Sequence, residues 1–118
     1  MSDPSNSRVV PDRSTIELAL RVAEKECAGV RPGSYWHGAA AALRWALGLR
    51  AVSPVSERHV VVDLDDAGRR PVRSEAETTY ELMSGGTRRA DVPGMRYLTG
   101  VENTCMWIVT GSGFAHPL

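Results

Sequence analysis

Apolar and charged residues alternate with helical spacing in the first half of the chain. The apolar positions of the first periodic stretch are Ile16, Ala19, Leu20, Ala23 and Cys27. This spacing places them on one face of a helix and leaves the intervening charges for the opposite face. Ser14 and Glu17 fit a capping box, in which each side chain satisfies a free backbone N–H group of the other. The pattern therefore predicts a helix from Ser14 to about Gly29.

A second periodic stretch, residues 35–47, is apolar around most of its circumference. Only His37, Ala41 and Arg44 form a narrow strip that is less apolar than the rest. A helix with so little polar surface is predicted to be covered by protein on most sides, so we expect it to be central. Pro32 and Gly33 supply the turn that leads into it.

The helical pattern breaks between residues 49 and 73. The β-branched run at residues 60–64, the turn residues 65–68 and the short stretch 69–72 leave room for one short β-hairpin. Ser74 and Glu77 then form a second capping box, which predicts a helix that ends near Gly85.

One order of residues occurs twice. Tyr35, Gly38 and Trp45 recur at the same intervals as Tyr97, Gly100 and Trp107, each time after a Pro-Gly pair. This order predicts an internal repeat, and hence a helix in the last segment. The alternative is an α+β fold in which that segment is a strand, because its Thr, Trp, Ile and Val residues favour strands.

These elements predict a single mainly α domain in which two tandem helical hairpins, residues 14–48 and 74–111, form a pseudo-twofold four-helix bundle. Residues 49–73 connect the hairpins, residues 1–13 form an irregular arm and residues 112–118 a tail. Trp45 and Trp107 are expected to be mostly buried at equivalent positions. Gly38 and Gly100 are expected where the two Trp-bearing segments cross.

The balance of charges excludes few classes of partner, but it does not favour a polyanion. Fourteen basic residues offset fourteen acidic ones among 118, so a nucleic acid partner is possible without being favoured. Nearly every basic residue is Arg, which is typical of a GC-rich bacterium such as an actinobacterium, or of its phage. No stretch has the length and apolarity of a membrane span, and the two cysteines lack metal or disulfide spacing. We expect a cytoplasmic protein without membrane contact, with two reduced and largely buried thiols.

Candidate chemistry is sparse. The one titratable cluster, residues 59–66, resembles a calcium loop at its start, yet Ala67 stands where an oxygen ligand is needed and Ser74 where a bidentate Glu is needed. A solvated turn is predicted there. A nucleophilic role for Cys105 would need His37 or His116 nearby, which no local motif indicates.

We therefore expect a small non-enzymatic helical module that binds a partner protein or itself, without metal or cofactor. The alternatives are a DNA-binding regulator and a small enzyme that uses the His59–Asp66 region or Cys105. The candidate interaction residues are Trp36, His37, Arg44, Arg69, Arg70, Arg88 and Arg89.

Overall fold

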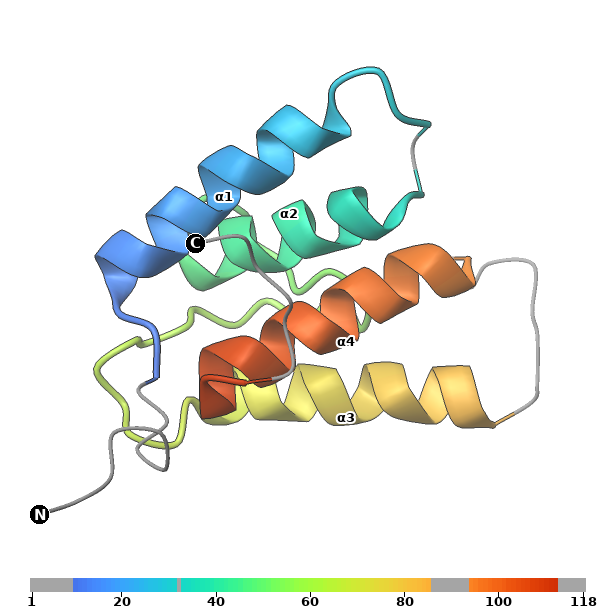
Figure 1. The fold of residues 1–118 in the computed structure, drawn as a ribbon. Helices are drawn as coiled ribbons and strands as arrows, with labels where there is room; N and C mark the ends of the chain where they lie inside the picture. The colour runs from blue at the N-terminus through green and yellow to red at the C-terminus, as the bar shows by residue number, and fades with distance from the viewer. Residues whose placement is uncertain (1–9, 32, 86–93, 113–118) are drawn as a thin grey trace, which may run out of the picture.

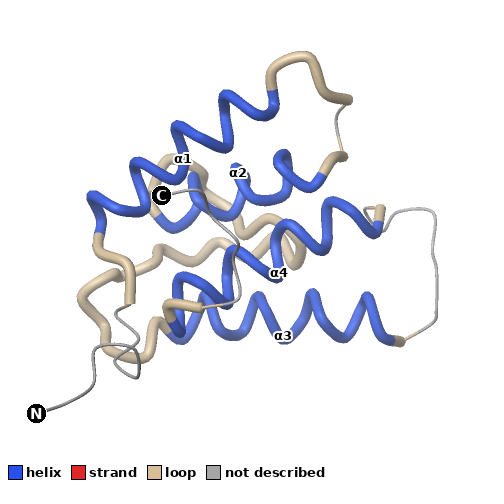
Figure 2. Tube along the Cα trace, viewed as in Figure 1, coloured by secondary structure: helices blue, strands red, loops and turns tan. Residues whose placement is uncertain are grey.

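Four helices make up the regular structure of residues 10–31, 33–85 and 94–112, which a computed structural model describes (Figure 1). They are α1 (Arg13–Cys27), α2 (Tyr35–Ala46), α3 (Arg70–Ser84) and α4 (Met95–Thr110). The rest of this described part is loop and turn without a strand (Figure 2). The mainly α fold is therefore confirmed. No helix in these ranges is long and apolar enough to cross a membrane.

The helices pack in the order α1, α2, α4, α3, so the second helix of each hairpin lies inside and the first lies outside (Figure 1). The hydrophobic core fills the spaces between these neighbours. Alanines on α2 and larger residues such as Leu43, Val101 and Ile108 are buried there. The predicted central position of the alanine-rich helix is confirmed, since its residues from Gly38 to Ala46 are buried except Arg44.

The two central helices touch at a glycine on each. A Cβ atom on Gly38 would overlap the main-chain carbonyl group of Tyr97, and one on Gly100 would overlap that of Tyr35. The contact is reciprocal, because each tyrosine lies three residues before the glycine of its own helix. The predicted crossing is confirmed. The predicted burial of the tryptophans is confirmed too, with 2% of Trp45 and 9% of Trp107 exposed.

Both predicted capping boxes are wrong, because each helix begins earlier. The N-cap of α1 is Asp12, whose carboxylate accepts a hydrogen bond of 2.9 Å from the backbone N–H of Thr15. Helix α3 begins at Arg70, with Pro71 in its first turn, where the missing N–H group of proline has no helical partner to lose. Ser14 and Ser74 are therefore helical residues.

The connection, residues 47–69, contains no β-hairpin, so that expectation is wrong. Val62 packs into the core and Leu64 lies against it, whereas Val61, just before Val62, is 86% exposed. The β-branched run that favoured a strand therefore belongs to an irregular segment that packs over the helices. The stretch expected to pair with it is partly the first turn of α3.

The strand alternative for the last segment is also wrong, because residues 95–110 are helix α4. Two of the three threonines of α4 donate hydrogen bonds to the backbone of their own helix. Thr99 donates to the carbonyl oxygen of Met95 at 2.8 Å, and Thr110 donates to that of Met106 at 2.7 Å. Packing against α2 then outweighs the modest strand preference of these residues.

Candidate functional site

Arg69, one of the expected interaction residues, lies inside the protein. Its guanidinium group donates to the carbonyl oxygens of Pro11 at 2.8 Å and Ile108 at 3.0 Å, and twice to that of Leu64 at 3.0 and 3.2 Å. Only 7% of the residue is exposed, and burial lowers its pKa. Arg69 therefore ties the start of the chain, the connection and α4 together.

The expected residues on α2 are engaged by their neighbours. Arg44 forms an ion pair of 3.1 Å with Glu24 of α1. His37 lies 2.7 Å from the hydroxyl of Ser34, measured from its Nδ1 atom, and Trp36 packs edge-on against Tyr35. The contacts of His37 and Trp36 hold the first turn of α2, and the ion pair of Arg44 joins the helix to α1.

The remaining expected residues are the arginines of the second half. Arg70 is exposed at the start of α3, and Arg88 and Arg89 lie outside the described residues. The structure thus does not bring the seven residues together in one surface. Their role in binding stays a prediction.

The His59–Asp66 region, considered for an enzyme, lies on the surface. His59, Asp63, Asp65 and Asp66 are exposed, and Asp63 accepts a hydrogen bond from the N–H of Asp65 at 2.9 Å, which closes a turn. Within the described ranges no three His, Cys, Asp or Glu residues are placed to hold a metal ion.

The two cysteines differ in exposure, and both are free thiols. Cys105 is fully buried, and this burial, together with the charges of Glu75 and Glu102, raises its pKa well above the ordinary value. Its thiol is therefore neutral and inert at neutral pH. Cys27 is partly exposed, so the expected burial holds for Cys105 alone.

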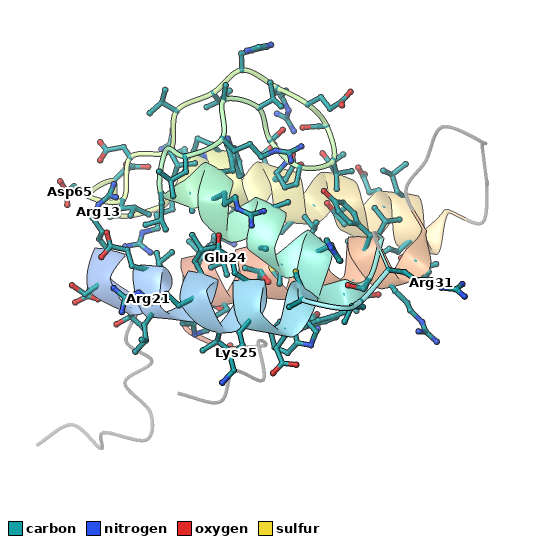
Figure 3. The ribbon with its side chains drawn as sticks, turned by 90° about the horizontal axis from the view of Figure 1, so that it is seen from above. Arg13, Arg21, Glu24, Lys25, Arg31 and Asp65 are labelled. Carbon is teal, nitrogen blue, oxygen red and sulfur yellow. The ribbon has the colours of Figure 1, made fainter. Side chains whose placement is uncertain are left out.

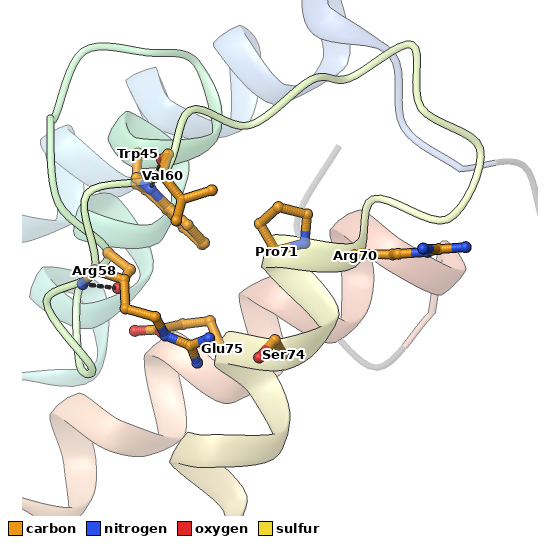
Figure 4. A pocket seen from close by; sticks show the side chains of 8 residues that line it. Trp45, Arg58, Val60, Arg70, Pro71, Ser74 and Glu75 are labelled. Atoms are coloured by element: carbon orange, nitrogen blue, oxygen red, sulfur yellow. Dashed lines mark hydrogen bonds between the residues drawn. The ribbon is translucent and has the colours of Figure 1, made fainter.

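The first hollow of interest lies between the connection and the start of α3 and measures about 250 Å³ (Figure 4). Its walls include the side chains of Trp45, Val60 and Pro71, which make it mainly apolar. Arg58 enters it from the connection. We call it the Trp45 hollow; its complete lining is Trp45, Ser53, Arg58, Val60, Arg70, Pro71, Ser74 and Glu75.

Glu75 anchors the connection beside this hollow. One carboxylate oxygen accepts hydrogen bonds from the N–H groups of Val55 at 2.6 Å and Ser56 at 3.0 Å, and the other accepts from the Ser56 hydroxyl at 2.5 Å. Only 1% of Glu75 is exposed. Glu75 was not among the predicted site residues, although one signal pointed to it: it shares the buried face of its helix with Val72, Ala76 and Thr79.

The second hollow is an open groove of about 590 Å³ on α3 and α4. Apolar lining comes from Ala76, Met106 and the ring of Tyr80, which is 60% exposed. We call it the acidic groove, because its lining also includes three carboxylates, those of Glu77, Glu81 and Glu102. None of the three forms an ion pair with another described residue.

The charges of α3 oppose its helix dipole. Arg70 and Arg73 lie in the first turn, Glu77 lies at the middle of the helix and Glu81 lies in its last turn. A helix prefers the reverse order by about 0.3–1 kcal/mol per charge, and two glutamates four residues apart also repel each other. Across the groove, burial raises the pKa of Glu102. These carboxylates are therefore placed at a cost to helix stability.

Comparisons of the chain with models of known families, with characterised proteins and with solved structures gave no match. The function must therefore be inferred from these hollows and their charges.

Proposed function

We propose that this protein is a non-enzymatic helical module that binds a basic, amphipathic segment of a partner protein in the acidic groove. The observation that carries the proposal is an apolar floor beside three carboxylates that lack a cationic partner within the described residues. A segment with apolar residues on one side and Lys or Arg beside them would match both features.

The size of the groove fits this kind of partner. Its volume of about 590 Å³ lies within the range of roughly 300–1,000 Å³ that is common for ligand sites. The site is open along α3 and α4, so it can receive several side chains of a segment that lies across the helices. Met106 supplies an adaptable apolar contact. Tyr80 offers a ring face to a cation, worth about 0.5–1 kcal/mol at an exposed site.

Binding would remove the electrostatic cost of the groove. A cation placed between Glu77 and Glu81 relieves their mutual repulsion and the unfavourable position of Glu81 near the C-terminal end of α3. No described residue forms an ion pair with Glu77 or Glu81 in the unbound protein, so the partner would supply the cation. Such contacts also accelerate association and make it depend on salt.

Another exposed helix face does not show this single sign of charge. On α1, Glu24 lies between Arg21 and Lys25 in the sequence, and all three are exposed (Figure 3). Glu24 is also paired with Arg44. The face of α1 is therefore mixed, whereas the groove is acidic throughout its charged lining.

A labelled amphipathic peptide of Leu and Lys tests the proposal, with a peptide of Leu and Glu as its matched opposite. Fluorescence anisotropy should show saturable binding of the basic peptide alone, which weakens as salt is raised. The double variant Glu77→Gln/Glu81→Gln should weaken binding about fivefold, if each exposed pair contributes roughly 0.5 kcal/mol.

The control is Glu17→Gln/Glu26→Gln, which makes the same change of charge on α1. This control should bind like the unaltered protein. Equal losses in the two double variants would show a general charge effect and contradict binding in the groove.

A further inference from the structure

We propose that the Trp45 hollow is a second binding site, which takes a small organic anion with a single aromatic ring. The proposal rests on a different cavity from the acidic groove, and Ser74 is the one residue that lines both. The chemical class follows from the apolar walls and from Arg58.

The hollow has room for one ring and a small substituent. Its volume is about 250 Å³. An apolar cavity of about 150 Å³ is enough to bind benzene in an engineered protein. Trp45, Val60 and Pro71 offer flat or branched apolar surfaces, which suit a planar ring (Figure 4).

The apolar walls are held in place before a ligand arrives. The indole N–H of Trp45 donates to the carbonyl oxygen of Val60 at 2.9 Å, which fixes the ring against the connection. Pro71 is held in the first turn of α3. Glu75 ties the connection to the same helix through Val55 and Ser56. A preformed site loses less conformational freedom on binding.

Arg58 determines the sign of charge that the hollow accepts. Its Nε atom donates to the Ser56 hydroxyl at 3.0 Å, and Nη2 donates to the Thr78 hydroxyl at 3.3 Å. These neutral partners leave further N–H groups of the guanidinium available, and no described carboxylate forms an ion pair with it.

Glu75 also lies beside the hollow, but its carboxylate is already satisfied. Both oxygens accept from the connection, one from two N–H groups and the other from the Ser56 hydroxyl. Ser56 thus separates the carboxylate from Arg58 while bonding to both. The group left to meet a ligand is the guanidinium, so an aromatic carboxylate fits better than a neutral ring or an amine.

Benzoate is the test probe, with benzamide as its neutral counterpart of the same shape. In spectra of ¹⁵N-labelled protein, millimolar benzoate should produce saturable shifts at the Trp45 indole N–H and at the amides of Val60 and Glu75, which line this hollow alone. Benzamide should bind about tenfold more weakly, because the charge-assisted hydrogen bond is lost. The amides of Tyr80 and Glu102, which belong to the acidic groove, should not shift.

Arg58→Gln should weaken benzoate binding about tenfold, and Arg58→Lys should retain most of it. Arg21→Gln is the matched control, because Arg21 is exposed on α1 and does not line the hollow. It should bind like the unaltered protein, as should Glu77→Gln/Glu81→Gln. If Arg58→Gln fails to fold, the comparison of benzoate with benzamide decides the question. No saturable shift, equal binding of benzamide, or equal losses in Arg58→Gln and Arg21→Gln would overturn the proposal.

Discussion

Replacing Gly38 with Ala should destabilise the protein, although this change usually stabilises a helix. Alanine is favoured over glycine by about 1 kcal/mol in a helix interior. At Gly38, however, the added methyl group would overlap the carbonyl group of Tyr97, and the backbone nitrogen of Val101 lies 3.2 Å from the same position. Backbone atoms of a packed helix cannot rotate away as the end of a side chain can.

The magnitude follows from what must move. To admit one methyl group, α2 and α4 have to separate where the buried alanines of α2 and Val101 of α4 are in close packing. Overpacking of this kind costs typically 1–3 kcal/mol. We expect a net loss at the upper end of this range for Gly38→Ala, because the displaced atoms belong to the backbone. That is a large part of the roughly 5–15 kcal/mol available to a domain.

Urea unfolding followed by circular dichroism measures the effect. Gly68→Ala is the control, because its added Cβ would meet only the side chain of Arg70 at 3.5 Å and its φ is not positive. It should be neutral or stabilising by up to about 1 kcal/mol. The double variant Gly38→Ala/Gly100→Ala should lose less than the sum of its parts, because both changes open the same crossing. A Gly38→Ala protein as stable as the unaltered one would refute the reasoning.

Three further substitutions test single contacts by the same unfolding assay. Thr104→Val should stabilise by about 1 kcal/mol, because the buried Thr104 hydroxyl has no partner among the described residues. Thr79→Val should not, because that hydroxyl donates to the main-chain carbonyl oxygen of Glu75 at 2.7 Å. Arg69→Met should cost about 3 kcal/mol or more, since several buried carbonyl oxygens lose their donor, and a smaller loss would contradict that role. Burial raises the pKa of Glu102 above its ordinary 4.5, so the folded state binds the proton more tightly and stability falls as pH rises through the folded pKa. Glu102→Gln should therefore be the more stable protein at pH 7, with the difference vanishing below pH 4.5; an equal difference at both pH values would contradict this.

The centre of the fold was predictable because its pattern is unambiguous. An alanine-rich helix with only one narrow strip of less apolar residues can remove its apolar surface from water only by burial, and α2 is buried as predicted. Gly38 and Gly100 indicated the crossing because glycine weakens a helix. Its presence inside one often means that another backbone comes close. The duplication suggested by the recurring Tyr, Gly and Trp positions stays a prediction.

The connection and the helix starts were less predictable, because their decisive contacts come from distant residues. Arg69 bonds to Pro11 and Ile108, which are remote from it in the sequence. Its left-handed backbone, with a φ of 43°, lets α3 begin directly after it. A pattern of neighbouring residues carries no information about such bonds. Val61 shows the same limit: it continues a β-branched run, yet it faces solvent.

The position of the two proposed sites follows from how the core is built. Helices α2 and α4 approach so closely at their glycines that each buries the facing surface of the other. Beyond the first turn of α2, only Arg44 is partly exposed. Polar side chains free to meet a ligand can therefore gather on outer α3, on the outer edge of α4 and on the connection. Glu77, Glu81 and Arg58 lie there, on elements that need no close backbone contact and so tolerate charged residues. Three of the seven residues predicted to bind a partner lie on α2. Its nearly continuous apolar surface drew attention to this helix, and the same surface is the reason that little of it is exposed.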